Sequence, residues 1–145
     1  MEIIIKRFDE LTVYELYEIM KLRVDVFIVE QNCPYADLDG VDLTALHVFL
    51  KDDDGIEAYL RIIPNKITGE CVWIGRVIAR KRRCGIGTQV LDAGIEAAKK
   101  YFHTNEIRIN AQVYARKFYE RVGFVQTTDE FLEDDIPHIG MTLKL

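Results

Sequence analysis

A strand, a basic loop with two glycines and a helix follow one another in the middle of the chain, and this succession constrains the fold most. Cys71 to Ala79 is rich in β-branched residues, which predicts a strand. A basic run, Arg80 to Arg83, then leads through Gly85 and Gly87 into a predicted helix. Its apolar positions are Val90, Leu91, Ile95, Ala98 and Phe102. Because the first N–H groups of a helix lack internal partners, this loop is predicted to bind an anionic group such as phosphate.

The glycine spacing distinguishes among the known phosphate-binding loops. A P-loop requires a Gly-Lys-Ser/Thr ending, which is absent, and the dinucleotide fingerprint requires glycine where Val90 stands. What remains is Arg-x-x-Gly-x-Gly from Arg82 to Gly87, whose basic neighbours suit a pyrophosphate. A solvated basic turn before an ordinary amphipathic helix is the alternative interpretation of the same residues.

The residues before this loop predict a strand, a helix and a β-hairpin. Glu2 to Arg7 has the pattern of a short strand, and Thr12 and Glu15 have the spacing of a capping box that opens a helix. The apolar face of that helix consists of Leu16, Ile19, Met20, Val24 and Phe27. Glu30 to Asp42 contains proline, glycine and aspartates, which predicts a surface loop that borders a substrate site. The hairpin is formed by His47 to Lys51, a turn at residues 52–55, and Ile56 to Ile62.

The residues after the loop complete a mixed α/β order. Ile107 to Ala111 is a predicted strand, and a short helix with Ala115, Phe118, Tyr119 and Val122 on its apolar face ends at Gly123. The last predicted strands are Phe124 to Thr127 and Ile139 to Leu145. Antiparallel strands first and a βαβ unit later predict an α/β (α+β) fold, with a mixed central sheet and flanking helices in one domain spanning residues 1–145.

Composition excludes several classes of protein. The formal net charge of -5 disfavours a general nucleic-acid binder. The N-terminus lacks the basic flank and cleavage site of a secretory signal, and no apolar run is long enough to span a membrane, so we expect a cytoplasmic protein. Cys33, Cys71 and Cys84 are an odd number without zinc-site spacing, which predicts reduced thiols and no metal.

Two motifs of this chain resemble the acetyl-CoA signature of the GCN5-related N-acetyltransferases. They are Val77-x-Ala79-x-x-Arg82-x-x-Gly85-x-Gly87 and, roughly thirty residues later, Phe118-Tyr119-Glu120-x-x-Gly123-Phe124. The resemblance extends to the ElaA-like branch through Arg23-x-x-Val26-Phe27-x-Val29-Glu30-Gln31-x-Cys33-Pro34-Tyr35 and Asp39-Gly40-x-Asp42. The family fold has a mainly antiparallel central sheet, and the family uses acetyl-CoA as cosubstrate.

The resemblance implies a set of cofactor-binding residues in the strand, the loop and the later motif. These are Val77, Ile78, Ala79, Arg82, Arg83, Cys84, Gly85, Ile86, Gly87, Thr88, Gln112 and Tyr119. Arg83 departs from the glycine common in the family, and Gln112 replaces an asparagine but keeps the amide. Neither departure argues against cofactor binding.

The resemblance also implies direct transfer of the acetyl group in a ternary complex. Tyr119 is expected to protonate the coenzyme A sulfur, and a backbone donor near Val77 to stabilise the oxyanion. A core position on an amphipathic helix is the alternative explanation for Tyr119. His138 is the first candidate for the general base because imidazole titrates in the useful range, with Glu30 and His47 as alternatives. A hydrogen-bonded histidine at a strand end is the competing explanation for His138.

Substrate binding is assigned to charged residues that the resemblance places around the acceptor cleft. These are Arg23, Glu30, Arg61 and Arg76. Guanidinium groups suggest an acceptor that carries an acidic group beside its amine. Cys33 as a covalent nucleophile is disfavoured because no histidine is close in sequence, and the aspartates at 37, 39 and 42 match a calcium loop only in part.

Two other functions remain open at this point: an acyl-CoA-binding regulatory module without transfer activity, and an unrelated phosphate-ligand domain. Tyr119 and His138 favour the enzyme over the first, and the absent lysine and third glycine weigh against the second. The expected partners are acetyl-CoA and an unidentified amine. The apolar final strand allows either a homodimer interface or completion of the chain's own sheet.

Overall fold

A mixed β-sheet runs through the part of the chain that the computed structural model describes, residues 1–64, 71–81 and 85–145. The strands lie in the order β1-β2-β3-β4-β5-β8-β6, with β7 also paired to β8. Their bounds are β1 (Glu2–Arg7), β2 (Leu46–Asp52), β3 (Gly55–Pro64), β4 (Cys71–Ala79), β5 (Glu106–Gln112), β6 (Val125–Gln126), β7 (Phe131–Glu133) and β8 (Ile136–Lys144). Of the described strand pairs, β4 with β5 is parallel and the others are antiparallel, which confirms the predicted mixed, mainly antiparallel sheet.

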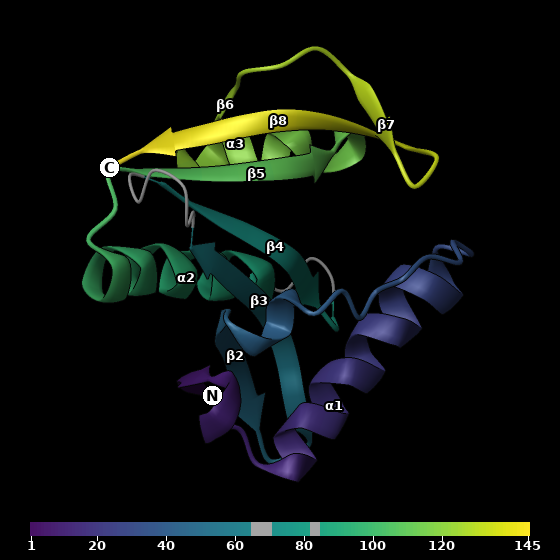
Figure 1. The fold of residues 1–145 in the computed structure, drawn as a ribbon, viewed down its shortest axis with the longest axis vertical. Helices are drawn as coiled ribbons and strands as arrows, with labels where there is room; N and C mark the ends of the chain where they lie inside the picture. Colours follow the sequence, from purple (N-terminus) through teal and green to yellow (C-terminus); the bar gives the residue numbers. More distant parts are fainter. Residues whose placement is uncertain (65–70, 82–84) are drawn as a thin grey trace.

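Helices cover both faces of this sheet (Figure 1). On one face, α1 (Val13–Arg23) packs Ile19 and Leu22 against a cluster that includes Tyr59 of β3. On the other face, α2 (Ile86–Phe102) and α3 (Arg116–Val122) contribute to the larger core. The predicted apolar positions of α2 are confirmed, since Val90, Leu91 and Ala98 are fully buried there. The two cores therefore fix the sheet between helical layers.

The start of α1 is fixed by the predicted capping box. The Thr12 hydroxyl accepts a hydrogen bond from the Glu15 N–H at 3.0 Å, and the Glu15 carboxylate accepts one from the Thr12 N–H at 2.9 Å. After Arg23 the helix continues through the predicted apolar positions Val24 and Phe27, but as a π-helical segment, η2 (Val24–Glu30), a form that the sequence pattern did not predict. This extension carries Phe27 to the wall of a cleft described below.

Three short 3-10 helices and two short strands complete the described part of the chain. The helices are η1 (Phe8–Glu10), η3 (Val41–Leu43) and η4 (Val113–Ala115). Gly123 ends α3 with φ of 114°, as its predicted role as a left-handed cap requires. The strand expected from Phe124 to Thr127 is only the two-residue β6, and β7 was not predicted at all. Both are held by pairing with β8 rather than by a pattern of their own.

Two irregularities of β4 open the sheet. β4 pairs with β5 only at Cys71, Val72 and Trp73, and beyond this point the two strands diverge (Figure 1). Where β4 pairs with β3, the register shifts so that one β3 residue, Leu60, faces both Arg76 and Val77. Arg76 adopts a φ of 53° within this bulge. Backbone N–H and C=O groups on the β5 side of β4 are thus left without a strand partner.

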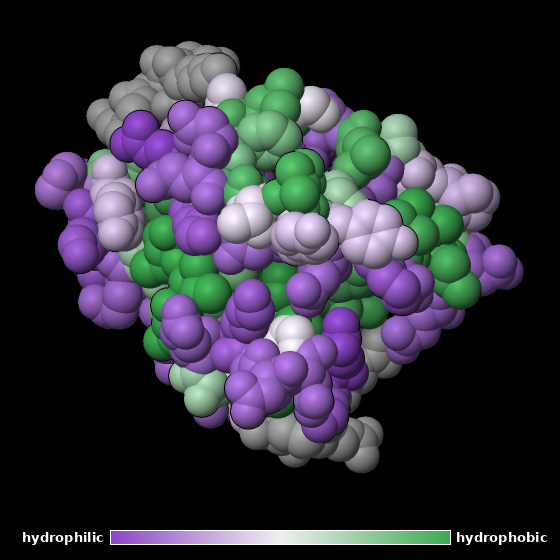
Figure 2. Space-filling view, turned by 90° about the horizontal axis from the view of Figure 1, so that it is seen from below, coloured by the Kyte–Doolittle hydropathy of each residue, from purple (hydrophilic) through white to green (hydrophobic). Residues whose placement is uncertain are grey.

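The outer face of α1 carries exposed apolar side chains with polar side chains between them. Val13, Tyr14 and Tyr17 are 75%, 80% and 70% exposed. α1 begins at the bottom of Figure 1, and the view from below shows hydrophobic and polar side chains interspersed over that face (Figure 2). Scattered exposed apolar residues of this kind are ordinary on a protein surface.

The turn between β7 and β8 stores backbone strain that a substitution should relieve. Asp134 and Asp135 have φ of 51° and 63°, which disfavours residues with a Cβ. We expect Asp135→Gly to raise the free energy of unfolding by about 0.5–1 kcal/mol, measured by urea denaturation. Asp54→Gly, in the β2–β3 turn but without a positive φ, is the control and is expected to destabilise the protein. Equal effects of the two variants would contradict the strain argument.

Candidate active site

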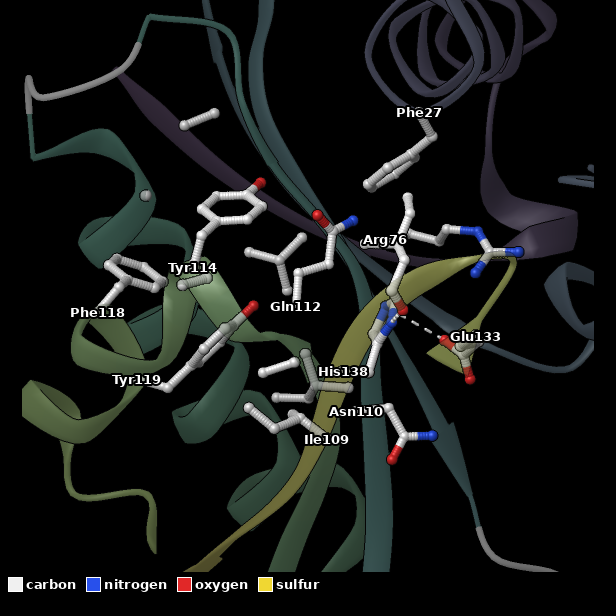
Figure 3. Close-up of a pocket in the computed structure, with 18 of the residues that line it drawn as sticks. Phe27, Arg76, Ile109, Asn110, Gln112, Tyr114, Phe118, Tyr119, Glu133 and His138 are labelled. Carbon is white, nitrogen blue, oxygen red and sulfur yellow. Dashed lines mark hydrogen bonds and ion pairs between the residues drawn. The ribbon is translucent and has the colours of Figure 1, made fainter. Parts of the chain in front are cut away.

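A cleft of about 890 Å³ lies where β4 and β5 diverge. Its walls come from β3, β4, β5, α3, the start of α2, η2 and the segment that follows it, η4, and the β7–β8 hairpin. Figure 3 shows side chains from these separate parts of the sequence converging on one cavity. The cleft has two ends, a loop-and-helix end near Gly85 and a second end near Glu133.

The first end brings together most of the predicted cofactor-binding residues. Those that line the cleft are Val77, Ala79, Gly85, Gly87, Thr88, Gln112 and Tyr119. Ile78 and Ile86 are buried in the two cores, so their side chains do not face this cavity. Arg82, Arg83 and Cys84 lie outside the described residues.

The glycines at this end permit a close approach of the backbone. Gly85 has φ of 77° immediately before α2, a conformation that favours glycine. A Cβ at Gly87 would lie 3.4 Å from Phe118 Cζ and 3.7 Å from the Ala79 Cβ, at ordinary van der Waals distance, so a longer side chain there would have to enter the cleft. The N-terminus of the 17-residue helix α2 therefore borders the cavity without side chains in the way, as an anion site requires.

Tyr119 projects from α3 into the cleft. Its ring packs edge-on against Phe118 and Phe124, with centroid distances of 5.0 Å and 5.7 Å, and its hydroxyl points toward the middle of the cavity (Figure 3). Burial raises the pKa of the phenol well above its usual value, so the hydroxyl stays protonated at neutral pH. Among the described residues the hydroxyl has no hydrogen-bond partner. The geometry therefore presents a proton donor to whatever occupies the cavity.

His138 lies across the cleft from Tyr119, at the start of β8 (Figure 3). Its Nδ1 is 2.6 Å from the Ile136 carbonyl oxygen. Because a carbonyl only accepts, Nδ1 carries the hydrogen, and the neutral ring has its lone pair on Nε2. Nε2 is 3.5 Å from a carboxylate oxygen of Glu133, and the ring stacks on Phe131 with a centroid distance of 6.1 Å. The ring is thus held at the second end of the cleft, where Nε2 can accept a proton when the ring is neutral.

The alternative bases do not reach this cavity. His47 is fully buried, with Nε2 2.9 Å from the Asp42 carbonyl oxygen and Nδ1 2.7 Å from the Tyr59 hydroxyl. Burial lowers the pKa of this imidazole, which keeps it neutral and structural. Glu30 is exposed at the end of η2 and does not line the cleft.

Arg23, expected to bind the substrate, is used to hold the loop between η2 and β2. It is 0% exposed, with Nε 3.0 Å from Asp37 Oδ2 and Nη1 2.6 Å from Asp42 Oδ1. It also donates to the Asp37 carbonyl at 2.9 Å, and it does not line the cleft. We therefore assign Arg23 to the structure of the loop and not to the acceptor.

Arg61 and Arg76 do line the cleft, but aspartates of the same loop neutralise both. Arg61 donates to both carboxylate oxygens of Asp39, at 2.9 Å and 2.7 Å, and to Asp42 at 2.9 Å. The Arg61 guanidinium lowers the pKa of Asp39 to about 2, so this pair stays charged. Arg76 donates from Nε to Asp37 Oδ1 at 2.8 Å. These contacts leave little positive charge for a carboxylate on the acceptor.

The aspartate partners of these arginines were not predicted from the sequence. Asp37, Asp39 and Asp42 were compared with a calcium loop, whereas in the structure the three aspartates and the three arginines form one network in which each aspartate pairs with two arginines. The sequence did offer a signal: the loop contains three aspartates, and three arginines were predicted to lie near it, which is typical of ion pairs. Glu133 and Gly75, also on the cleft, were given no role.

Two further features concern metals and membranes. No three His, Cys, Asp or Glu side chains in the described ranges are grouped as metal ligands. Every helix in those ranges is too short or too polar to span a bilayer.

Comparison with known proteins agrees with this architecture. A model of the acetyltransferase (GNAT) domain family matches residues 28–145. Protein ElaA of Escherichia coli strain K12 is 40% identical over 141 residues, which cover 94% of this chain and 92% of the relative. The crystal structure of Escherichia coli ElaA superposes with a TM-score of 0.90, covering 98% of this chain and 99% of that chain. The structure of an acyl-CoA N-acyltransferase from Pseudomonas aeruginosa superposes with a TM-score of 0.89 at 38% identity and the same coverage.

The local features that characterise the family are therefore present together with the global match. The diverging β4 and β5, the glycine loop at α2 and the tyrosine of α3 all meet at one cleft. The chain belongs to the acetyltransferase (GNAT) family, in its ElaA-like branch.

Proposed function

We propose that the protein transfers the acetyl group of acetyl-CoA directly to a primary amine of a small molecule or an exposed protein amine. The observation that carries the proposal is the meeting of a β4 edge without a strand partner and the Tyr119 hydroxyl in one cleft. Acyl-CoA as the cosubstrate follows from the family. The acetyl group as the acyl part and the amine as the acceptor are the finer assignments proposed here.

The cofactor would lie along the open side of β4. Its pyrophosphate fits the N-terminus of α2 at Gly85 and Gly87, where backbone N–H groups point outward. Its pantetheine amides can pair with the β4 backbone beyond Trp73, because β5 does not. The thioester would then reach the bulge at Arg76 and Val77, where a backbone N–H can donate to the developing oxyanion.

The proton transfers balance with two residues. The acceptor ammonium gives one proton to His138 Nε2, and its nitrogen attacks the thioester carbon while the carbonyl oxygen takes the negative charge. The C–S bond then breaks, and the sulfur takes the proton of the Tyr119 hydroxyl. The nitrogen of the new amide then gives its second surplus proton to the tyrosinate oxygen of Tyr119, so the hydroxyl is protonated again. His138 releases its proton to water, and the products are the amide and coenzyme A.

Calorimetric titration with acetyl-CoA tests the donor half of this proposal. We expect saturable one-to-one binding that Gly87→Glu weakens by at least about ten-fold, because the new carboxylate repels phosphate and crowds Phe118. Gln89→Glu adds the same charge in the first turn of α2, at an exposed position that does not line the cleft, and should leave most of the affinity. Absence of binding to the unaltered protein would exclude the proposed function.

A further inference from the structure

Gly75 occupies a position in the middle of β4 where nothing in the backbone calls for glycine. Its φ is not in the left-handed region, and a Cβ built on it would meet no atom within 4 Å. Glycine in a strand interior weakens the strand and often marks a site where a ligand comes close. The space above Gly75 is therefore a hollow in the sheet, part of the cleft.

The strand register shows what surrounds this hollow. Gly75 pairs with Arg61, and Trp73, two residues earlier in β4, pairs with Ile63. Because side chains alternate along a strand, the side chains of Arg61, Trp73 and Ile63 lie on the same face of the sheet as the open position at Gly75, the face covered by α1. His138 reaches the same face from β8 through its pairing with Gln112 of β5. The acceptor chamber is defined here as the part of the cleft above Gly75, between Trp73 and His138.

The walls of the acceptor chamber are largely apolar and aromatic. Trp73 and Ile63, which are paired across β3 and β4, both line the cleft. Phe27 of η2 also projects into it (Figure 3). Tyr35 also lines the cleft, with the Arg76 guanidinium 5.4 Å from its ring centroid and its hydroxyl donating to Asp37 at 2.8 Å. Aromatic side chains held in place suit a flat apolar ligand, because the packing of two aromatic rings stabilises a complex by more than the buried apolar area alone.

Charge at the acceptor chamber has one sign. Arg61 and Arg76 are neutralised by their aspartates, whereas Glu133 and Asp134 also line the cleft. Glu133 is the carboxylate beside His138 Nε2 and is 47% exposed, so it can contact an incoming ammonium. A carboxylate on the ligand would be repelled by Glu133, and Arg61 and Arg76 could not bind it well because each is already paired with an aspartate.

We propose that the acceptor is a primary amine on a flat apolar body without a carboxylate, that Gly75 admits this body, and that Glu133 selects the ammonium. The proposal rests on the proposed function, since the chamber opens onto the same cleft, and it names the substrate class. It replaces the sequence-based expectation of an acceptor that carries both an amine and an acidic group.

The single tryptophan of the chain makes the chamber directly observable. Trp73 lines the cleft, so ligand binding there should change its fluorescence without any turnover. In the presence of coenzyme A, we expect phenethylamine to bind at least about ten-fold more tightly than L-phenylalanine, which adds a carboxylate, and than putrescine, which lacks a ring. Tighter binding of L-phenylalanine or putrescine, or no response to phenethylamine, would overturn the assignment.

Two variants locate the effect in the chamber. Gly75→Val should fold normally, because its Cβ has space and valine favours strands, yet weaken phenethylamine by at least about ten-fold with acetyl-CoA affinity retained. Glu133→Gln should weaken phenethylamine, whereas Glu130→Gln, an exposed neighbour outside the cleft, should not. Unchanged amine affinity in Gly75→Val would refute the role of Gly75. Loss of acetyl-CoA binding in the unaltered protein would instead remove the proposed function as a whole.

Discussion

Tyr119→Phe is expected to lower the single-turnover rate of acetyl transfer by about 100-fold or more, with the dissociation constant for acetyl-CoA changed less than about two-fold. The substitution removes one hydroxyl and leaves the ring between Phe118 and Phe124. The hydroxyl is protonated because burial raises its pKa, and it faces the cavity where the sulfur would leave. Rapid-quench measurement of one turnover isolates this chemical step from product release.

The matched control for this prediction is Tyr101→Phe. Tyr101 is a half-exposed residue of α2 that does not line the cleft, so the same chemical change there should leave the rate unaltered. A wild-type single-turnover rate in Tyr119→Phe would show that another group protonates the sulfur. A large increase in the dissociation constant would show that Tyr119 binds the cofactor instead of acting on it.

Asp42→Asn is expected to lower the free energy of unfolding by about 3–5 kcal/mol. Asp42 accepts from Arg23 at 2.6 Å and from Arg61 at 2.9 Å, and both guanidinium groups are almost completely buried. The asparagine keeps the shape of the side chain but leaves two buried cations with one carboxylate fewer. Urea denaturation of the variant measures the loss.

Asp53→Asn supplies the comparison for Asp42. It removes the same charge from an exposed position in the β2–β3 turn and should change stability by less than about 0.5 kcal/mol. If Asp42→Asn is equally mild, the ion-pair network does not hold the loop between η2 and β2. The neutralisation of Arg61 and Arg76 that underlies the acceptor argument would then need another explanation.

Local patterns predicted the elements that position the cofactor end. β4 has the predicted bounds, Cys71–Ala79, because its β-branched residues mark a buried strand between clear turn signals. Gly85 at the start of α2, α2 itself and the cap at Gly123 were likewise predictable, since each depends on residues close in sequence. The end of the cleft near Gly85 and Gly87, where we propose that the cofactor binds, could therefore largely be predicted from the sequence.

The acceptor end depends on contacts that no local pattern contains. Arg23 meets Asp37 across 14 residues, and Arg76 meets the same aspartate across 39. β6 and β7 are too short to show an alternating strand pattern in the sequence, and in the structure they are defined by their pairing with β8. The role of Gly75 likewise follows from what faces it across β3 and from the absence of any neighbour above it.

Acetyl transfer to an amine can be tested by detecting coenzyme A release and N-acetylated product together by mass spectrometry. The protein would be incubated with acetyl-CoA and, separately, an arylalkylamine, an amino acid and a peptide with a lysine side chain. We expect equimolar coenzyme A and acetylated amine with at least one of these acceptors, and less of both products with Tyr119→Phe. Release of coenzyme A without acetylated product, or no release with any amine, would contradict it.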